Sequence, residues 1–451
     1  MNLQGKKVLV FGSGKSGIGA AELLGQVGAE PVIYDGNADL DKEAVVHKVK
    51  HCKGISVYAG ELPEEVRKAL DLVVLSPGVP TDIPIVKSFY EQGLPVWGEV
   101  ELAYRTGKGR VLAITGTNGK TTTTALLGKI MGDAEESVFV VGNIGTPYTS
   151  KALEMQDNTT TVAEISSFQL ETIEEFAPKV SAILNITEDH LNRHHTMEEY
   201  IRVKELIVKN QTADDFCILN YEDPVLREFG QNITPKVVYF SSVRKLEAGI
   251  YLDGDQIILK TSEEEIPLVR TGELKLLGQH NFENIMAASA MAYYAGVPVE
   301  SIRKSICEFT AVEHRIEYVT EKNGVVYYND SKGTNPDAAI KGIQAMNRPT
   351  LLIGGGYDKG SGYDEWLNAF DGKVRYLVLI GQTRDKIKAA AERLGVCPCI
   401  LCENLEEAVK VCAEKANPGD AVLLSPACAS WGQFDNYEQR GDMFKEYVRN
   451  L

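Results

Sequence analysis

The sequence predicts an α/β protein of three domains, each built on a largely parallel sheet. Short apolar, β-branched runs, from 6–11 at one end to 421–424 at the other, alternate with longer helical stretches along most of the chain. This alternation is typical of parallel sheets that are covered by helices. It is interrupted near Gly98 and near Ala311. The predicted domains are therefore 1–98, 99–311 and 312–451.

The middle domain carries a second kind of pattern. Between Tyr239 and Leu277, short alternating strands with charged turns replace the long helical stretches, which predicts a small antiparallel edge on the middle sheet. A chain of 451 residues is also long enough for roughly two to four domains with separate cores. Three successive sheets therefore fit the sequence better than one.

Composition and charge narrow the class of protein. Apolar residues make up 44% and charged residues 24% of the chain, which is ordinary globular usage and argues against disorder or a fibrous repeat. The net charge of -16 repels a phosphate backbone at long range, so we do not expect nucleic-acid binding. The N-terminus has no signal-peptide pattern, and no apolar run approaches the length of a membrane span. We expect a cytoplasmic protein that does not bind membranes.

The eight cysteines are scattered through mostly apolar segments and do not form the framework of a secreted, disulfide-rich protein. Cys399 and Cys402 have C-x-x-C spacing, but they lie in a strand-like run and no second pair follows. We therefore expect buried structural thiols rather than a zinc site.

A glycine-rich loop follows the first strand. Gly12, Gly14 and Gly17 form G-x-G-x-x-G between the strand 6–11 and a helical segment, where main-chain N–H groups and a helix N-terminus can cradle a diphosphate. Asp35 ends the second strand, where a carboxylate can meet a ribose or a base. The alternative is that helix packing alone requires these glycines. The pattern predicts a Rossmann-like N-terminal domain for a ligand with a diphosphate, NAD included.

A turn formed by Ser76, Pro77 and Gly78 follows the apolar run 72–75. The carboxyl end of a parallel strand is where the ligand of such a domain would lie. An ordinary Pro-Gly turn is an equally good interpretation of these residues alone.

The most specific stretch is a phosphate loop at 115–122. It follows the strand 110–114 and precedes a helical segment, so its main-chain N–H groups can wrap the β- and γ-phosphates of a nucleotide. Lys120 would neutralise phosphate charge, and the Thr121 hydroxyl would hold Mg²⁺. Ile114 takes the place of the first glycine of the strict motif, but the strand, loop and helix context is intact. The predicted ATP-binding residues of the loop are Gly116, Thr117, Asn118, Gly119, Lys120, Thr121 and Thr122.

Polar side chains follow other strands and one helix of the middle domain. Asn143 lies in a turn after one strand and could offer its amide to a developing oxyanion. Glu164 ends another strand, where a carboxylate suits Mg²⁺, although it could instead cap the next helix. His190 follows a third strand, but a single histidine is normally a surface or packed residue. Lys204 lies in the helical segment 197–210, and the simplest interpretation is a solvated helix lysine.

Taken in order, these motifs resemble the Mur ligase family, and the resemblance covers nearly the whole chain. It implies a three-domain protein whose C-terminal domain is also Rossmann-like. The chain has the phosphate loop, then N-I-G at 143–145, E-I-S-S-F-Q at 164–169, N-x-x-x-D-H at 185–190, a helix lysine, H-N-x-x-N at 280–284, E-H-R at 313–315, N-D-S-K-x-T-N at 329–335 and L-L-S-P-A-x-A-S at 423–430.

The resemblance changes the expected role of several residues in the middle domain. By position, Lys204 is the lysine that the family carbamylates, and its new carboxylate would help Glu164 and His190 to place a second Mg²⁺. Asn281 and Asn284 match asparagines that contact adenine and metal-bound phosphate. Without the family, these two would be interpreted as part of a helix N-cap.

The third domain is implied to bind both ATP and the incoming amino acid. Arg315, Asp330 and Lys332 match residues that bind the ribose and phosphates of ATP; without the resemblance they read as an exposed turn with a charge pair. The positions that match the family's D-glutamate contacts are Thr334, Lys359, Ser430 and Tyr437.

The first domain is implied to bind the UDP-linked substrate. After Asp35 this chain has Gly36 and Asn37, where some members carry Thr-Arg near the uracil. The predicted contacts are Gly14, Lys15, Ser16, Asp35, Ser76, Pro77 and Gly78.

The implied activity is that of an ATP-dependent ligase in peptidoglycan precursor biosynthesis. It would join D-glutamate to UDP-N-acetylmuramoyl-L-alanine through an acyl-phosphate, using ATP and two Mg²⁺ ions, and it would act as a monomer. The residues predicted to take part in catalysis are Lys120, Asn143, Glu164, His190, Lys204 and Lys332.

Other functions stay open at this point. Related ligases add alanine, diaminopimelate or lysine, or extend folate with glutamate; the D-N-P-[RA] pattern of the diaminopimelate- or lysine-adding members does not occur here. A nucleotide sensor without turnover would have no need for Glu164, His190 and Lys204 together. An NAD dehydrogenase would explain Gly12 to Asp35 but leaves the phosphate loop without a role.

Overall fold

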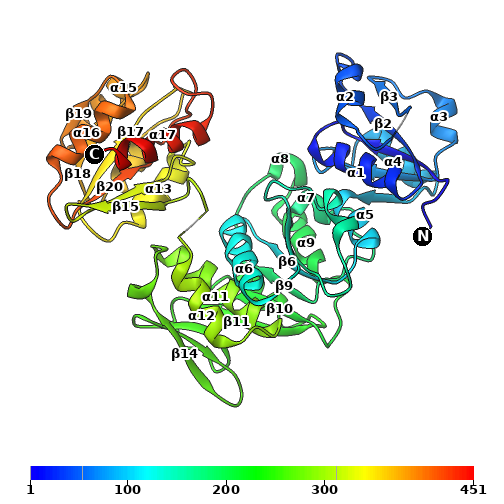
Figure 1. Cartoon of the computed structure of the whole chain (residues 1–451), viewed down its shortest axis with the longest axis horizontal. Helices are drawn as coiled ribbons and strands as arrows, with labels where there is room; N and C mark the ends of the chain where they lie inside the picture. Colours follow the sequence, from blue (N-terminus) through cyan, green and yellow to red (C-terminus); the bar gives the residue numbers. More distant parts are fainter. Residues whose placement is uncertain (1, 53, 311) are drawn as a thin grey trace. The chain divides into compact units, whose positions relative to one another are not determined.

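A computed structural model describes residues 2–52, 54–310 and 312–451 and contains three sheets (Figure 1). The predicted three-domain α/β architecture is confirmed. The chain forms two compact units: Met1–Leu268 with Asn284–Ser305, and Val269–Glu283 with Ile306–Leu451. The predicted boundary at Ala311 falls outside the described residues, and the domain limits stay a prediction.

The first sheet has the order β3-β2-β1-β4-β5, and its strand pairs are parallel. Because side chains alternate between the two faces of a strand, Val8 and Val10 join one core cluster while Leu9 and Phe11 join another. The strands are β1 (Lys7–Phe11), β2 (Glu30–Asp35), β3 (Ser56–Ala59), β4 (Leu72–Leu75) and β5 (Val96–Gly98), with helices α1 (Lys15–Gln26), α2 (Lys42–Lys48), α3 (Glu64–Lys68) and α4 (Pro84–Glu91).

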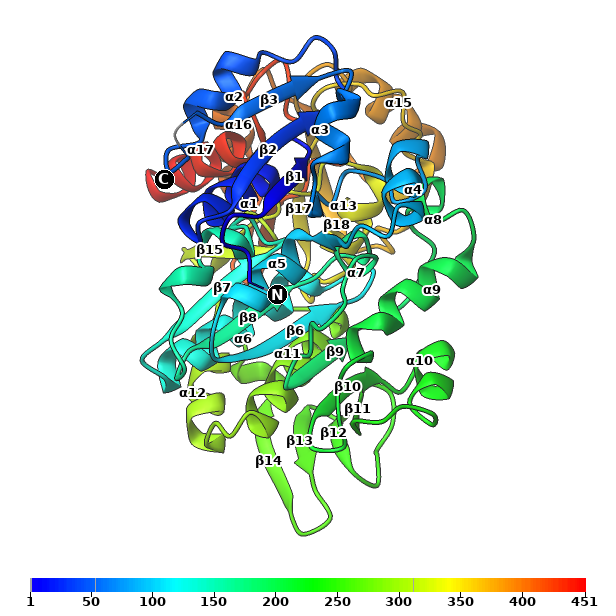
Figure 2. The same ribbon diagram turned by 90° about the vertical axis from the view of Figure 1, so that its right-hand side faces the viewer.

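The middle sheet has the order β14-β13-β12-β11-β10-β9-β6-β8-β7, and Figure 2 shows β7, β8, β6 and β9 in succession. The pairs from β7 to β12 are parallel, whereas β12 pairs antiparallel with β13, so the predicted antiparallel edge is confirmed. The strands are β6 (Arg110–Thr115), β7 (Val138–Gly142), β8 (Thr160–Glu164), β9 (Val180–Ile183), β10 (Phe216–Asn220), β11 (Lys236–Ser241), β12 (Gly249–Asp253), β13 (Gln256–Lys260) and β14 (Glu265–Arg270).

Helices of several lengths accompany the middle sheet, and α6 packs against β7 and β8. They are α5 (Glu99–Thr106), α6 (Lys120–Ala134), α7 (Ser167–Leu170), α8 (Leu191–His194), α9 (Met197–Glu205), α10 (Pro224–Phe229), α11 (Gln279–Tyr294) and α12 (Val299–Glu308).

The third sheet has the order β15-β16-β20-β17-β18-β19, with β15 antiparallel to β16 and the other pairs parallel. Its strands are β15 (Glu317–Lys322), β16 (Val325–Asn329), β17 (Thr350–Gly354), β18 (Val374–Leu379), β19 (Cys399–Leu401) and β20 (Ala421–Leu424). Its helices are α13 (Pro336–Gln344), α14 (Asp364–Asn368), α15 (Arg384–Leu394), α16 (Leu405–Lys415) and α17 (Tyr437–Arg449).

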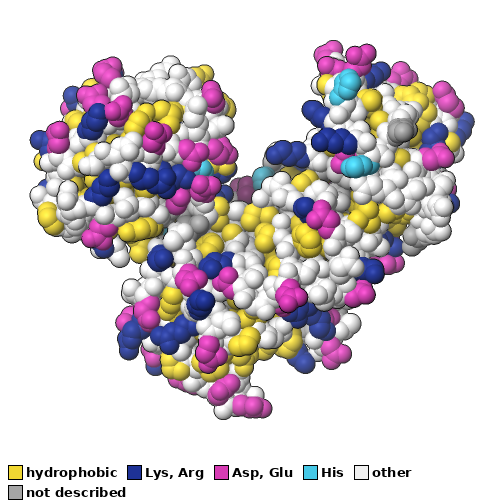
Figure 3. Space-filling view, viewed as in Figure 1, with side chains coloured by type: hydrophobic (Ala, Val, Ile, Leu, Met, Phe, Trp, Pro, Cys, Tyr) yellow, Lys and Arg dark blue, Asp and Glu magenta, His cyan; other side chains and the backbone are white. Residues whose placement is uncertain are grey.

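The sequence also predicts buried cysteines and no membrane span. On the face in Figure 3, acidic and basic side chains are interspersed. Among the helices that the structure describes, none combines the length and the apolarity needed to cross a bilayer. The eight cysteines are free thiols; Cys402 is buried, whereas Cys399 is only partly so.

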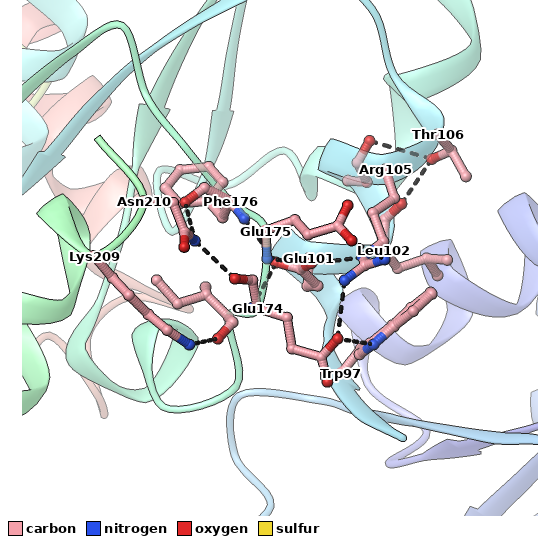
Figure 4. Close-up of polar contacts among 12 residues, drawn as sticks. Trp97, Glu101, Leu102, Arg105, Thr106, Glu174, Glu175, Phe176, Lys209 and Asn210 are labelled. Carbon is pink, nitrogen blue, oxygen red and sulfur yellow. Dashed lines mark hydrogen bonds and ion pairs between the residues drawn. The ribbon is translucent and has the colours of Figure 1, made fainter. Parts of the chain in front are cut away.

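Glu101 connects the helix after the first domain to a loop of the middle domain (Figure 4). Its fully buried carboxylate accepts hydrogen bonds from the main-chain nitrogens of Glu174, Glu175 and Phe176 at 2.9, 2.8 and 3.1 Å. The Arg105 guanidinium donates to it at 2.6 Å. Charge-assisted bonds of this kind are strong, so Glu101 fixes the start of the middle domain.

Glu101→Ala should lower the free energy of unfolding by about 3 kcal/mol, because it leaves three main-chain N–H groups without their acceptor and removes one of the three carboxylates that pair with Arg105. Urea unfolding followed by circular dichroism would measure the loss. The exposed pair of Glu154 with Lys151 provides the control, since Glu154→Ala should cost less than about 1 kcal/mol. Equal losses in the two variants would contradict this account of Glu101.

Candidate active site

Four loops of the middle domain begin side by side at one sheet edge. In the parallel register, Glu164 lies opposite Ile114 of β6 and Gly142 of β7, and Thr115 lies opposite Ile183 of β9. Because the carboxyl ends of parallel strands meet at one edge, the loops after β6, β7, β8 and β9 converge there. This edge brings together the phosphate loop, Asn143, Glu164 and His190.

The phosphate loop is held in shape by neighbouring asparagines. Gly119 has φ +84 at the N-cap of α6, and a Cβ there would lie 2.3 Å from Asn284 Oδ1, so only glycine fits. The Asn118 main-chain nitrogen donates to Asn185 Oδ1 at 2.8 Å, and Asn185 Nδ2 donates to the Asn118 carbonyl at 3.1 Å. The loop is therefore pre-formed, and Thr121 and Thr122 follow in the first turn of α6.

Two lysine amines meet at this loop. Lys120 Nζ donates to the carbonyls of Gly116 and Thr117 at 2.9 and 2.8 Å. Lys204 Nζ donates to the same Gly116 carbonyl at 2.8 Å. The Lys204 amine, predicted to be carbamylated, thus lies directly against the phosphate loop.

Lys204 is buried, whereas its helical segment alone suggests a solvated lysine. The side chain is 1% exposed, so the prediction of a solvated lysine is wrong. Tyr200 and Val203 form the apolar face of α9, and Lys204 lies on that face because it is four residues after Tyr200. Burial, helped by the charge of Lys120, lowers the pKa of Lys204 to about 7.

Glu164 offers a carboxylate oxygen without a partner. The residue is 1% exposed, and its Oε1 accepts from Asn143 Nδ2 at 2.7 Å. Its Oε2 is buried and accepts no hydrogen bond from the described residues. A buried anionic oxygen without a partner is costly, and a bound cation would satisfy it. The Asn143 amide, predicted to face an oxyanion, uses one N–H group in this bond to Glu164, and its second N–H group is a further donor.

His190 begins α8 in the left-handed region, with φ 54. Its exposed ring lies 4.9 Å from the Phe168 ring, and its Nε2 lies 3.5 Å from a carboxylate oxygen of Asp189. The ring is accessible at the sheet edge, as a metal ligand would need to be.

In the first domain the glycines of the loop divide into two roles. A Cβ on Gly17 would lie 1.9 Å from the Gly12 carbonyl oxygen, so helix packing requires glycine there. Around Gly14, at the N-cap of α1, the space is open, as close approach of a ligand demands. Lys15 and Ser16 form the first turn of α1.

Asp35 supports this loop from the end of β2. Its Oδ2 accepts from the nitrogen and the hydroxyl of Ser13 at 3.0 and 2.6 Å, and its Oδ1 accepts from the Asn37 nitrogen at 3.0 Å. Partial burial raises the pKa of Asp35, but these hydrogen bonds outweigh it and leave the pKa below its usual value. Asp35 is therefore an anion at neutral pH.

The turn of Ser76, Pro77 and Gly78 borders a pocket shared with the middle domain. Ser76 Oγ donates to the Gly12 carbonyl at 3.5 Å, which ties the turn to the glycine-rich loop. The pocket is lined by Leu75, Ser76, Pro77, Val79, Thr81, Gly98, Glu99, Phe168, Gln169, Thr172 and Arg193.

The third sheet has its own convergent edge. Leu424 of β20 lies opposite Asn329 of β16 and Ile353 of β17, and all three strands are parallel. The loops that follow them carry the predicted residues Asp330, Lys332, Thr334, Lys359 and Ser430.

Asp330 is not part of an exposed charge pair. It is 6% exposed, and its Oδ2 accepts from the Ser425 hydroxyl at 2.7 Å. Burial raises its pKa to about 7. Because Asp330 is buried, its interpretation as part of an exposed charge pair is wrong. Arg315, by contrast, is exposed.

Two lysines of this edge lie on aromatic rings. Lys332 Nζ is 3.8 Å from the centroid of Tyr437, and Lys359 Nζ is 4.6 Å from that of Trp431, arrangements that orient a cation. Burial, together with the charge of Arg315, lowers the pKa of Lys332, and burial raises the pKa of Tyr437 to about 12.

The two asparagines of the H-N-x-x-N motif have separate surroundings. Asn284 Oδ1 accepts from Thr123 in α6 at 3.2 Å, close to the phosphate loop. Asn281 belongs to the other compact unit and donates from Nδ2 to the Leu277 carbonyl at 2.7 Å.

Sequence reasoning missed Arg193, Glu171 and Tyr200. Tyr200 lies under the Lys204 amine, 4.7 Å from its ring centroid, and its hydroxyl lies 3.1 Å from the Thr117 hydroxyl. The only signal for Tyr200 was its place on the apolar face of the helix. Arg193 lies three residues after His190, and no sequence pattern predicts a functional role for it.

Comparison with known proteins covers the whole chain. Residues 6–98 match the description "Mur ligase MurD-like, N-terminal domain", residues 114–292 "Mur ligase middle domain" and residues 314–428 "Mur ligase, glutamate ligase domain". A relative from Lachnoclostridium phytofermentans, named UDP-N-acetylmuramoylalanine--D-glutamate ligase, is 57% identical over 100% of this chain and 99% of its own length. A relative of the same name from Lachnospira eligens is 54% identical over 100% of both.

Solved structures share the fold at lower identity. The UDP-N-acetylmuramate-alanine ligase of Thermotoga maritima has a TM-score of 0.60 at 19% identity over 99% of each chain. A MurF ligase from Thermotoga maritima in complex with ADP has a TM-score of 0.57 at 16% identity, over 93% of this chain and 95% of its own.

Proposed function

The chain belongs to the Mur ligase family, and from that premise we propose that it joins D-glutamate to UDP-N-acetylmuramoyl-L-alanine at the expense of ATP, in peptidoglycan precursor synthesis. The observation that carries the proposal is the sheet edge where the phosphate loop, Glu164 and Lys204 converge. It gathers cationic and metal-binding groups where a nucleotide's phosphates would lie. The products are ADP, phosphate and an amide.

The first step brings two anions together, because the substrate carboxylate attacks the γ-phosphate of ATP. Lys120 can neutralise phosphate charge there, since its amine already lies within the loop. The pre-formed loop leads into the N-terminus of α6, where the main-chain N–H groups from Lys120 to Thr122 can bind the phosphates. The step forms an acyl-phosphate and releases ADP.

Two Mg²⁺ ions complete the proposed site. Thr121, Glu164, His190 and a carbamylated Lys204 would hold them. When bound, Mg²⁺ offsets the negative charge that develops on the phosphates. These residues fit Mg²⁺, because Glu164 Oε2 is buried without a hydrogen-bond partner among the described residues and oxygen ligands suit this ion. The buried Lys204 amine, with its pKa lowered to about 7, is suited to carbamate formation.

The second step is attack by the amine of D-glutamate on the activated carbonyl. We assign Thr334, Lys359, Ser430 and Tyr437 to binding of the amino acid, because they gather at the edge of the third sheet. Lys332 or Asn143 would stabilise the tetrahedral oxyanion.

The remaining assignments follow the same family pattern. ATP would also meet Asn281, Asn284, Arg315 and Asp330, and the UDP-linked acid would meet the first domain. We propose a cytoplasmic monomer that binds neither nucleic acid nor membranes; the net charge of -16 argues against nucleic-acid binding. The proposed UDP-substrate contacts are Gly14, Lys15, Ser16, Asp35, Ser76, Pro77 and Gly78.

A coupled phosphate-release assay tests the proposed function. UDP-N-acetylmuramoyl-L-alanine and ATP are supplied with each candidate amino acid in turn, and release is expected only with D-glutamate. Release with alanine, lysine or diaminopimelate instead would point to another member of the family. No release with any amino acid would favour a nucleotide sensor.

Lys359→Met should raise the KM for D-glutamate about tenfold or more, because the variant loses a cation for a substrate carboxylate. The KM for ATP should stay within about twofold of wild type. Initial rates over a range of D-glutamate concentrations would measure the effect. Lys388→Met removes a lysine that pairs with Glu392 on the surface of α15 and should change neither constant. A normal KM for D-glutamate in Lys359→Met would exclude Lys359 from the amino-acid site.

A further inference from the structure

Arg193 links the predicted metal edge to the first domain. Its Nη2 donates to the Val79 carbonyl, in the segment that follows the Ser76 turn, at 3.0 Å. Its Nε and Nη2 also donate to the two carboxylate oxygens of Glu171 at 3.2 and 2.5 Å. The guanidinium lies 5.0 Å from the ring of Phe168. One side chain therefore contacts both the first domain and the segment 168–171 of the middle domain.

This ion pair is largely removed from solvent. The side chains of Arg193 and Glu171 are 11% and 10% exposed. Screening by water is weak at such sites, and a planar guanidinium can bind a carboxylate with two parallel bonds. The pair is therefore a rigid link, unlike an exposed surface ion pair.

The same short helix carries His190. Arg193 donates its main-chain nitrogen to the His190 carbonyl at 2.9 Å, within the turn that starts α8. A shift of the Arg193 backbone would therefore move His190. The arginine couples the first-domain segment to a residue of the proposed metal site.

Two further contacts hold the segment 76–82 against the middle domain. The Thr81 hydroxyl donates to Glu171 Oε2 at 3.3 Å. The His195 ring lies 2.9 Å from Asp82 Oδ2 through its Nε2. The segment 76–82 is therefore attached to the middle domain at Val79, Thr81 and Asp82. Glu171 accepts the bond from Thr81, and it also pairs with Arg193, which binds Val79.

The pocket lies along this junction. Ser76 and Pro77 line it from the first domain, and Phe168, Gln169 and Arg193 line it from the middle domain. A substrate whose diphosphate rests on the first domain and whose carboxylate reaches ATP at the phosphate loop of the middle domain would span this junction. The position of the segment 76–82 therefore sets the span available to that substrate.

The geometry points to Arg193 as a positioning residue for the UDP-linked acid: through Glu171 and the Val79 carbonyl it fixes the segment 76–82 relative to His190. The inference rests on the proposed function, because it assumes that the acid binds across the junction. It assigns Arg193 no contact with the reacting atoms. Its effect is on substrate placement, to which reaction rates are sensitive.

Arg193→Lys is the main test. A lysine keeps the charge, but its single ammonium cannot reproduce the guanidinium's paired bonds to Glu171 together with the bond to Val79. We expect the KM for UDP-N-acetylmuramoyl-L-alanine to rise about tenfold, with the KM for ATP and for D-glutamate within about twofold of wild type. Arg202→Lys is the matched control, since Arg202 pairs on the surface with Glu199 and should leave all three constants unchanged.

Thermal unfolding would first establish that Arg193→Lys is folded. If it is not, Thr81→Val decides instead, because it removes only the hydroxyl that binds Glu171 and should raise the same KM about fivefold, the effect of one lost hydrogen bond. An unchanged KM for the UDP-linked acid in the folded variant would overturn the inference, as would equal rises in all three KM values. Wild-type phosphate release that does not require the UDP-linked acid would contradict the proposed function rather than the role of Arg193.

Discussion

Lys204→Ala should lower the rate of phosphate release by more than about a hundredfold, the size of effect seen when one preorganised electrostatic group is lost from an active site. The lysine lies against the Gly116 carbonyl of the phosphate loop and is almost fully buried. Its pKa is lowered to about 7, so a large share of the amine is neutral near that pH and can react with CO₂. Alanine removes both the amine and the carboxylate that it would carry.

Short carboxylates should partly restore the activity of Lys204→Ala. Formate or acetate can enter the space left by the side chain and supply an anionic oxygen near Glu164. Lys209→Ala is the matched control, because Lys209 also donates to a main-chain carbonyl, that of Ile173, but away from the phosphate loop. Rates with and without about 0.1 M formate compare the two variants. Full activity of Lys204→Ala without any added carboxylate would rule out the carbamate.

Glu164→Gln should also reduce kcat by more than about a hundredfold, while the fold is kept. The amide has the shape of the carboxylate and can still accept the bond from Asn143, which reaches Oε1 at 2.7 Å. It lacks the negative charge that the unpartnered Oε2 would present to Mg²⁺. The loss should therefore fall on metal binding and on kcat, with the thermal midpoint close to that of wild type.

A titration with Mg²⁺ makes the Glu164 test specific. The Mg²⁺ concentration that gives half-maximal rate should rise in Glu164→Gln. Glu154→Gln, which alters an exposed pair with Lys151, should behave as wild type. A Glu164→Gln enzyme with unchanged kcat and unchanged Mg²⁺ dependence would remove Glu164 from the proposed metal site.

The main features of the site could be predicted because parallel strands end at one edge. Glu164 ends one apolar strand and the phosphate loop follows another, and both strands are evident in the sequence, so the sequence alone predicts that they converge. The glycine-rich loop was predictable in position but not in detail. Gly17 is required by packing against Gly12, whereas Gly14 leaves open space, and the spacing G-x-G-x-x-G does not separate these two reasons.

What could not be predicted depends on contacts between residues far apart in sequence. The spacing of apolar residues predicts the buried face of α9. A lysine on that face is nevertheless predicted to be solvated, because buried lysines are rare. The Lys204 amine can be buried because it donates to the Gly116 carbonyl, which lies 88 residues away in sequence. Arg193 reaches Val79 across 114 residues, and Lys359 lies on Trp431. Only the packed structure brings these pairs together.

The most direct test of this account is ¹³C NMR of the active enzyme in buffer with ¹³C-labelled bicarbonate. With a carbamate on Lys204, at the edge where the phosphate loop and Glu164 converge, wild type should give a carbamate carbon resonance that is absent from Lys204→Ala. A fully active wild-type enzyme without a labelled carbon at Lys204 would contradict it.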